Sequence, residues 1–485
     1  MRVSRRTLIG SCLVASAAAS AVSARAAAKA DGMVLTPEMF GAKGDGITND
    51  SAAFAALADR VNLLGGGTVR LRPTTYIVGS QTRQLREDRG HAFAPAKLLH
   101  LRGCRLPVTI EGNGARLRCA TGLRFGTFDA RTGEPTKHGM PYFEVRERAT
   151  PYEYMIVAEE CSGPVAIYDL ELDGNLPSMR IGGQYGDTGW QIAGSGIFLR
   201  NNRGDEIIRD VYSHHHPQDG LMIDGDDDPA LAARVRRRID NLRSEYNGRQ
   251  GCSIVGGRGY RFGRCKFNHT GKAVLYSAPG AGLDIEAEGA KRNVDLEFTD
   301  CEFSNNSGCA MVADSGDSEG ALFTRCKFLG TTNWSAWPRK PLFRFQDCTF
   351  LGSVVNCFGD QDPRRAAQFV NCTFTDDPRL SPTGEVYLGG RKNYAIVDLS
   401  NSKNVRFSRC SFRCVKDGLL PWSWFAIYSD CKMEQKSEER AYPKGKYFGV
   451  NSMVGHVDLY GTIVVGSLTL NGKALPVGQM GGEPW

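Results

Sequence analysis

A short phrase, cysteine followed by any residue and then phenylalanine, recurs through the middle of this 485-residue chain. It begins at Cys265, Cys301, Cys326, Cys348, Cys372 and Cys410. A period in the low twenties, lengthened at some repeats, is typical of a solenoid whose longer repeats hold loop insertions. Equivalent positions of successive coils stack, so the phrase predicts a buried row of thiols beside a buried row of phenyl rings.

A second phrase, a glycine followed by alternating apolar residues, interleaves with the first. It occurs at Gly196–Leu199, Gly220–Ile223, Gly251–Ile254, Gly282–Ile285 and Gly308–Met311. Each copy has the pattern of a short strand entered through a glycine. Two strands per coil at steady offsets, in a chain with 57 glycines, predict an all-β right-handed parallel β-helix. The leucines and helices of leucine-rich repeats are missing, and a propeller needs a period about twice as long.

The open ends of a solenoid expose unpaired strand edges and therefore need caps. Residues 50–64 predict an N-terminal capping helix, with Asn49 or Asp50 as its N-cap. Its apolar face consists of Phe54, Leu57, Val61 and Leu64. We expect the cap and first strands in residues 31–80, the β-helix in 81–414, and the last coils with a C-terminal cap in 415–485.

Residues 1–26 have the features of a twin-arginine signal peptide. Arg5 and Arg6 precede a weakly hydrophobic run that ends in Ala24-Arg25-Ala26, a small-residue cleavage site. The sequence therefore predicts a periplasmic or secreted protein. No other stretch is long enough to span a bilayer, so no membrane association is expected after the signal is removed.

The charge and the cysteines exclude some partners and leave one question open. Removing Arg2, Arg5, Arg6 and Arg25 with the signal lowers the formal net charge from +7 to +3, and the basic residues form no stripe, so a nucleic-acid partner is not expected. Fifteen cysteines in an exported chain would ordinarily indicate disulfides. Their places in the stacked phrase instead favour buried thiols, with a disulfide inside the stack as the alternative.

The N-terminal region carries a family resemblance. Phe40-Gly-Ala-Lys-Gly-Asp-Gly-Ile-Thr-Asn-Asp50, the predicted helix, Gly65-Gly-Gly-Thr-Val and Pro73-Thr-Thr-Tyr76 resemble the opening of the pectate-lyase-like superfamily. That superfamily includes rhamnogalacturonases, family 28 related glycosidases, exo-glucanases, uronate epimerases and phage tailspikes. The resemblance, over residues 31 to about 415, implies a right-handed β-helix acting on a polysaccharide or oligosaccharide, as a monomer or a homotrimer. The Asn-Thr-Asp and Gly-His-Gly phrases of typical polygalacturonases are absent, so their catalytic residues are not carried over.

Stacking the glycine-led strands predicts two outward rows of side chains, with successive coils about 4.8 Å apart. One row reads Arg200, Asp224, Val255, Glu286 and Val312; the other reads Phe198, Met222, Ser253, Asp284 and Ala310. Asp224 and Glu286 would lie roughly 9.5 Å apart, at the upper end of the carboxyl separation of an inverting glycosidase. With Asp219 and Asp284 they form the candidate catalytic set.

Polar residues on the approach to these strands are candidates for binding substrate. They are His215, His216, Gln218, Arg249, Gln250, Lys272 and Tyr276. Trp334 and Trp337, like Trp422 and Trp424, are candidates for stacking on sugar rings. The consecutive histidines 214–216 lack a second His or Cys set at ligand spacing, so no zinc site is expected.

The residues leave three functions open. The favoured one is an inverting glycoside hydrolase that requires no cofactor. The second is a polysaccharide lyase, in which Ca²⁺ held by Asp284, Glu286 and Glu288, or else Arg249, neutralises a uronate. Lys272, Tyr276 or a histidine would then abstract the neighbouring proton. The third is a glycan-binding β-helix without catalytic activity.

Overall fold

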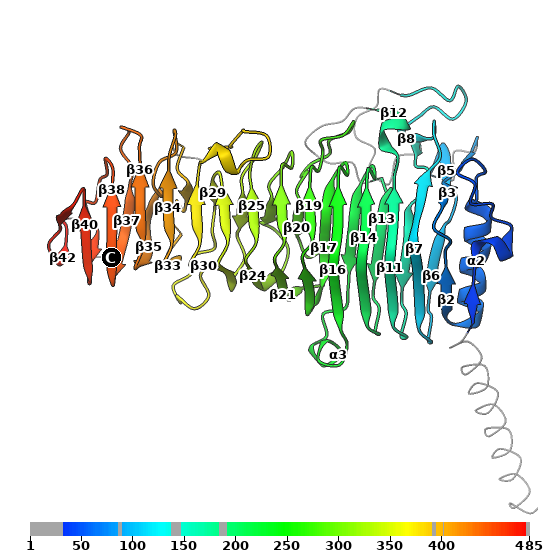
Figure 1. Ribbon diagram of the computed structural model, residues 1–485, viewed down its shortest axis with the longest axis horizontal. Helices are drawn as coiled ribbons and strands as arrows, with labels where there is room; N and C mark the ends of the chain where they lie inside the picture. Colours follow the sequence, from blue (N-terminus) through cyan, green and yellow to red (C-terminus); the bar gives the residue numbers. More distant parts are fainter. Residues whose placement is uncertain are drawn as a thin grey trace, which may run out of the picture.

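The computed structural model describes residues 33–85, 90–136, 147–183, 192–389, 394–400 and 402–481. The predicted signal, residues 1–26, lies outside this part of the chain. The molecule is a long stack of strands with the helix α2 at one end and the C-terminus at the other (Figure 1). Neighbouring coils pair in parallel along almost the whole stack. The predicted right-handed parallel β-helix is confirmed.

One face of the stack, here called the site face, is built from the glycine-led strands and their equivalents. Its strands are β6 (Leu99–Arg102), β10 (Tyr154–Glu159), β13 (Ser195–Arg200), β15 (Asp219–Asp224), β17 (Gln250–Arg258), β20 (Leu283–Ile285), β23 (Met311–Ala313), β26 (Ala336–Pro338), β29 (Val354–Val355) and β32 (Val397–Asp398). Each strand pairs in parallel with the one in the next coil. Outward side chains on this face therefore form rows along the axis of the molecule.

The other strands of the coils belong to a second, larger parallel sheet that bends at a corner. They are β1 (Val34–Leu35), β2 (Gly67–Arg70), β3 (Thr75–Val78), β7 (Val108–Cys119), β11 (Val165–Asp173), β14 (Glu206–His214), β16 (Arg237–Glu245), β18 (Tyr260–Gly263), β19 (Lys266–Asn268), β21 (Asn293–Thr299), β22 (Glu302–Ser304), β24 (Ser318–Thr324), β25 (Lys327–Leu329), β27 (Phe343–Gln346), β28 (Thr349–Leu351), β30 (Gln368–Val370), β31 (Thr373–Thr375), β33 (Arg406–Ser408), β34 (Ser411–Cys414), β35 (Ser423–Ser429), β36 (Lys432–Gln435), β37 (Pro443–Phe448), β38 (Val450–Val454), β39 (Ile463–Val464) and β40 (Ser467–Leu470). The antiparallel strands β41 (Lys473–Ala474) and β42 (Gly478–Gln479) close the C-terminal end.

The remaining elements lie outside the regular coils. A small sheet contains β4 (Gln81–Arg83), β5 (Phe93–Pro95), β8 (Arg124–Thr127), β9 (Arg148–Ala149) and β12 (Arg180–Gly182). The helices are η1 (Pro37–Phe40), α2 (Ser51–Leu64), η2 (Leu176–Ser178), α3 (Pro229–Ala232) and η3 (Pro378–Leu380). Within the described ranges, none of them is long and apolar enough to cross a membrane.

The corner of the larger sheet explains the cysteine phrase. The residue before each cysteine adopts the left-handed backbone conformation, as Arg264, Asp300 and Asn371 do. This conformation turns the chain through the corner, and the cysteine and phenylalanine that follow then both point inward. Asp and Asn tolerate it best among residues with a side chain.

The interior contains the predicted rows of side chains. Phe303, Phe328 and Phe350 stack with ring centroids 4.8–5.0 Å apart and nearly parallel planes. A second row through Phe298, Phe323 and others stacks in the same way. All 14 described cysteines are buried and free. The buried thiol row is therefore confirmed, and no disulfide occurs in the described ranges.

Helix α2 caps the N-terminal end, as predicted. Phe54, Leu57 and Val61 are fully buried against the first coils. Asp50 occupies the N-cap position, but its carboxylate accepts hydrogen bonds from the backbone N–H groups of Lys43 and Gly44, at 2.7 and 3.1 Å, instead of capping the helix. The glycine-rich opening phrase is thus a loop clasped by this aspartate.

Candidate functional site

The site face brings one predicted row together and shifts another. Met222 pairs with Ser253, and Ser253 with Asp284, as expected. The next residue in that row is Val312, because Leu283 pairs with Met311. The predicted place of Ala310 in this row is therefore wrong by two residues. The register follows the buried residues Leu283 and Met311 and not the two glycines.

The predicted row from Asp224 to Glu286 is also broken. β17 contains a bulge, so Asp224 pairs with Gly256, whereas the backbone N–H of Glu286 bonds to the carbonyl of Ile254 beside Val255. An extra residue in one strand changes the alignment of everything beyond it. The two carboxylates therefore do not share one straight row.

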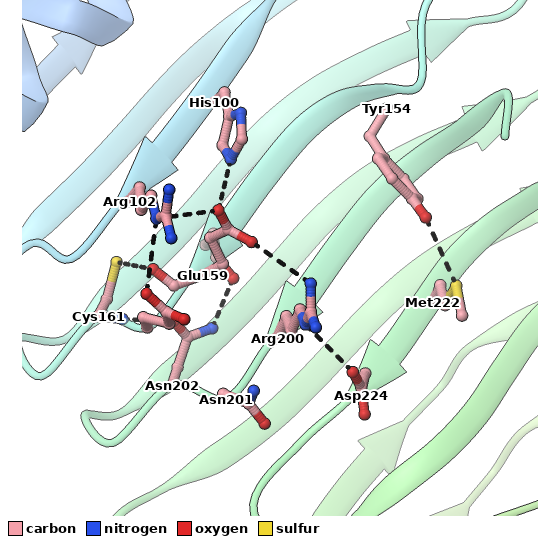
Figure 2. A network of polar contacts seen from close by, with 12 residues as sticks. His100, Arg102, Tyr154, Glu159, Cys161, Arg200, Asn201, Asn202, Met222 and Asp224 are labelled. Atoms are coloured by element: carbon pink, nitrogen blue, oxygen red, sulfur yellow. Dashed lines mark hydrogen bonds and ion pairs between the residues drawn. The ribbon is translucent and has the colours of Figure 1, made fainter. Parts of the chain in front are cut away.

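Asp224 ends a ladder of ion pairs on the site face (Figure 2). Glu159 contacts His100 at 2.8 Å and Arg200 at 3.9 Å, and Arg200 contacts Asp224 at 3.4 Å. Lys291 binds the same aspartate from a later coil. Arg200 and Lys291 both occupy the Asp224 carboxylate, which suits this residue to a supporting contact between coils.

Asp219 and Arg249 form a buried ion pair. The Arg249 Nε and one terminal nitrogen donate to the two carboxylate oxygens of Asp219, at 2.8 and 2.5 Å. Asp219 has no exposed surface, and the attraction of its charge raises the pKa of Arg249. The pair connects the first residue of β15 with the residue just before β17. Its two parallel hydrogen bonds therefore hold these neighbouring coils together beneath the site face.

Asp284 is the most perturbed carboxyl group of this region. Its side chain is 4% exposed; Oδ2 accepts a hydrogen bond from Gln250 Nε2 at 2.6 Å, and Oδ1 has no partner among the described residues. Burial raises its pKa well above the ordinary value, and the nearby Glu286 charge raises it further, against the opposing effect of Arg249. These surroundings favour the protonated form of Asp284 over the ionised one.

Two further carboxylates lie next to Asp284. Glu286 directly follows the end of β20, is partly exposed, and accepts a hydrogen bond from the Ser315 hydroxyl. Asp314 lies two residues after Val312, the strand partner of Asp284, and its charge also raises the Asp284 pKa. Sequence reasoning missed Asp314 because it aligned the strands by glycine. The alternation Met311, Val312, Ala313, Asp314 would have matched Leu283, Asp284, Ile285, Glu286.

Three of the predicted binding residues lie beneath the surface. His216 is fully buried, its Nδ1 lies 2.9 Å from the Tyr152 hydroxyl, and burial lowers its pKa well below the usual value. Gln218 is buried and accepts from the Ser195 hydroxyl at 3.0 Å. Gln250 orients Asp284, as described above. These side chains build the wall of the site and do not present free polar groups at its surface.

The loop before β20 carries two predicted residues nearer the surface. The Lys272 ammonium donates to the Thr332 hydroxyl at 2.6 Å, and partial burial lowers its pKa. Tyr276 is 37% exposed. Gly271 and Gly280 lie against its ring, where an added Cβ would come within 2.7 Å of ring carbons.

An apolar patch extends the row of Asp284 along the axis. Trp337 pairs with Val312, the strand partner of Asp284, and so lies two coils from Asp284. It packs edge to face on Trp334 with centroids 5.0 Å apart. The two tryptophans cover a small cluster with Ala281. The Trp337 indole N–H is buried and lacks a partner among the described residues.

Three features establish the architecture: the N-terminal loop held by Asp50, the parallel pairing of the coils, and the helix α2 that caps the stack. The chain folds as a right-handed parallel β-helix. No protein-family model matches it. A capsule-specific depolymerase of Klebsiella phage KN3-1 is 36% identical over 88 residues, which are 18% of this chain and 10% of that protein. The matched stretch thus spans about a tenth of that curated relative.

Solved structures with this β-helix architecture share little sequence with the chain. The A-module of the mannuronan C-5 epimerase AlgE4 from Azotobacter vinelandii is 14% identical, with 90% of this chain and 100% of that chain covered and a TM-score of 0.45. The tailspike protein gp49 of Pseudomonas phage LKA1 is 12% identical, with 90% and 84% covered and a TM-score of 0.44.

Metal-binding geometry on this β-helix lies away from the predicted calcium set. In the described ranges, one group of three ligand atoms lies within 4.8 Å of one another, and it consists of Asp173, His214 and His215. Glu288, the third member of the predicted calcium set, is exposed in the loop after β20. Asp284, Glu286 and Asp314 instead form the carboxyl cluster of the site face.

Proposed function

We propose that this protein is an exported enzyme that cleaves glycosidic bonds of a polysaccharide as an inverting glycoside hydrolase. The observation that carries the proposal is the pair formed by the buried Asp284, whose pKa is raised, and the partly exposed Glu286 two residues further along the chain. A buried carboxyl group with a raised pKa beside a second, more exposed carboxyl group supplies the acid and the base that this chemistry needs.

Each group has a defined part in the reaction. Asp284 donates its proton to the oxygen of the leaving sugar, and Glu286 accepts a proton from the attacking water molecule, with Asp314 as the other candidate base. Residues two apart in an extended segment are separated by roughly 6.7 Å along the backbone. A carboxyl separation of that size leaves room for the water of an inverting reaction more readily than the roughly 5 Å of a retaining one.

The surroundings of Asp284 support a sugar polymer as substrate. Trp337 lies two coils from Asp284 in one row, roughly 9.6 Å along the axis. An indole face at that distance suits a sugar ring bound beyond the cleaved bond. The local similarity to a capsule depolymerase agrees with an extracellular polysaccharide.

A polysaccharide lyase is the second candidate. The observation that favours it is the lowered pKa of Lys272 beside the exposed Tyr276, because an amine with a reduced pKa is a better base near neutral pH. Arg249, which was predicted to neutralise a uronate, already donates two hydrogen bonds to the carboxylate of Asp219. This leaves the lyase to depend on a cation.

The deciding experiment incubates the purified protein with neutral and acidic polysaccharides, with calcium and with a chelator. New reducing ends and the ultraviolet absorbance of unsaturated products are followed together. The hydrolase predicts reducing ends without absorbance, and kcat for Asp284→Asn lowered by about 10²–10⁴-fold. Asp300→Asn, which changes an exposed carboxylate on another face, is the matched control.

Other results would reject the hydrolase. A parallel rise in absorbance and reducing ends would establish elimination and return attention to Lys272. Tight binding without any cleavage, with Asp284→Asn changing the affinity alone, would establish the non-catalytic glycan-binding protein instead.

A further inference from the structure

Three metal-ligating atoms converge at the corner between the larger sheet and the site face. His214 Nδ1 lies 2.7 Å from His215 Nδ1 and 3.7 Å from Asp173 Oδ1. A tetrahedral zinc ion holds two bound atoms roughly 3.3 Å apart, given its bond lengths of about 2.0–2.1 Å. The two observed separations lie on either side of that value.

Two features of the backbone create this convergence. Asp173 on β11 pairs directly with His214 on β14, so the carboxylate of one coil lies beside the imidazole of the next. Consecutive residues of a strand point to opposite faces. His215 has a left-handed backbone with φ of 53°, which turns its ring back toward His214.

The hydrogen bonds around His214 leave its Nδ1 unprotonated, with a lone pair that can bind a metal ion. Its Nε2 lies 3.1 Å from Glu171 Oε1, and because a carboxylate only accepts, the ring proton of the neutral imidazole belongs on Nε2. Metal-bound histidines characteristically donate their other nitrogen to a carboxylate in this way. Asp173 Oδ2 is taken by Arg116, while Oδ1 accepts the Asn175 N–H at 2.8 Å and keeps a lone pair toward His214.

The rings are also held in place before any ion binds. The His214 ring stacks on Tyr212 with centroids 4.0 Å apart, and the His215 ring stacks on Tyr246 at 5.0 Å with planes 11° apart. His214 and Asp173 are 5% and 4% exposed, respectively. Little side-chain freedom would therefore be lost on binding.

We propose that Asp173, His214 and His215 bind a divalent first-row transition metal ion, with Zn²⁺ as the best fit. Two imidazole nitrogens and one carboxylate oxygen are ligands that zinc accepts, and they leave a fourth position on the exposed side of His215. The ion clips one coil to the next at the corner. This site is separate from the Asp284 cluster and does not depend on the proposed hydrolysis.

The test uses the purified protein, stripped with a chelator and then titrated with Zn²⁺ alone by calorimetry and with Co²⁺ by visible absorption. One ion per chain is expected, with the Co²⁺ spectrum of a tetrahedral nitrogen and oxygen site. His215→Ala and Asp173→Asn are each expected to weaken binding at least tenfold. His100→Gln, a histidine that contacts Glu159 on the site face, is the matched control and keeps full affinity.

Either of two outcomes overturns the proposal. One is no stoichiometric binding, which would mean that a proton shared between the two rings explains their closeness. The other is equal loss in His100→Gln, which would mean adventitious binding to surface histidines. His215 is only half-buried, so His215→Ala is expected to fold normally. Circular dichroism of this variant verifies that any loss of metal binding does not result from unfolding.

Discussion

Asp284 and Asp219 are both buried aspartates on the site face, yet their partners give them opposite roles. Asp219 is matched by the two-fold hydrogen bond of Arg249, so its charge is compensated in place. Asp284 receives one hydrogen bond, from the neutral amide of Gln250, and faces the charge of Glu286. A buried carboxyl group without a cationic partner avoids its charge by keeping its proton.

This difference predicts how stability depends on pH. The folded-state pKa of Asp284 is raised above its unfolded value of about 3.9, so the folded protein binds the proton more tightly. The contribution of this proton to stability is fully present below the unfolded pKa and is lost as pH rises through the folded pKa. Because asparagine does not titrate, Asp284→Asn removes this loss of stability at high pH.

We therefore expect Asp284→Asn to raise the Tm at pH 8 and to leave it nearly unchanged at pH 4, while turnover is lost. Thermal unfolding of both proteins across this range measures the effect. Equal Tm differences at the two pH values would show that Asp284 is not held as a protonated acid. A lower Tm at pH 8 would show the same.

At the scale of the element, each coil is built around the corner and the inward pair that follows it. The left-handed residue turns the chain, the cysteine fills the tight corner, and the phenyl ring stacks on its equivalents. A thiol suits the corner because it is small, and its sulfur donates weakly to carbonyl groups, as Cys348 does to Phe323. Burial also raises the pKa of the corner thiols of Cys301 and Cys410, which leaves little reactive thiolate at these two positions.

These rows predict the behaviour of the cysteines in solution. In denaturant without reductant, a thiol-exchange reagent is expected to titrate the 14 cysteines of the described chain. In the native protein the same reagent is expected to react orders of magnitude more slowly, because opening of the coil must come first. A lower count in denaturant would reveal a disulfide in the stack, and rapid native reaction would reveal an exposed thiol.

At the scale of the whole molecule, the stack depends on its ends. Each coil contacts only its neighbours, so the first coil would expose its interior without α2. Figure 1 shows this helix lying across the N-terminal end of the stack. Leu57 is fully buried there, whereas Leu63 on the same helix is 76% exposed. Substituting each of the two leucines by alanine therefore distinguishes the effect of capping the stack from the effect of helix propensity.

Leu57→Ala is expected to lower the free energy of unfolding by about 2–5 kcal/mol, because it leaves a cavity under the cap. Leu63→Ala is expected to change it by no more than about 0.5 kcal/mol. Chemical denaturation followed by circular dichroism compares them, and light scattering detects association through the uncovered strand edges. Equal effects of the two substitutions would show that α2 does not support the stack.

The β-helix, its stacked interior and its capping helix were all predictable from the sequence alone. Each depends on a pattern that is local and repeated. The residue before each cysteine turns the corner, the alternation of apolar residues selects the inward face, and the period reveals the coil. A pattern that recurs in every coil can be recognised even when one of the repeats is aligned incorrectly.

The candidate site depended on tertiary structure, because it depends on how coils far apart in sequence align. Packing of Met311 against Leu283 set the register that brings Asp314 beside Asp284, and the bulge in β17 separated Asp224 from Glu286. Strand pairing between coils likewise placed Asp173 beside His214. The sequence by itself determined which residues belong to the coils. Only packing between the coils decided which carboxylates and histidines meet, because a shift of one or two residues leaves the local pattern almost unchanged while moving every outward side chain.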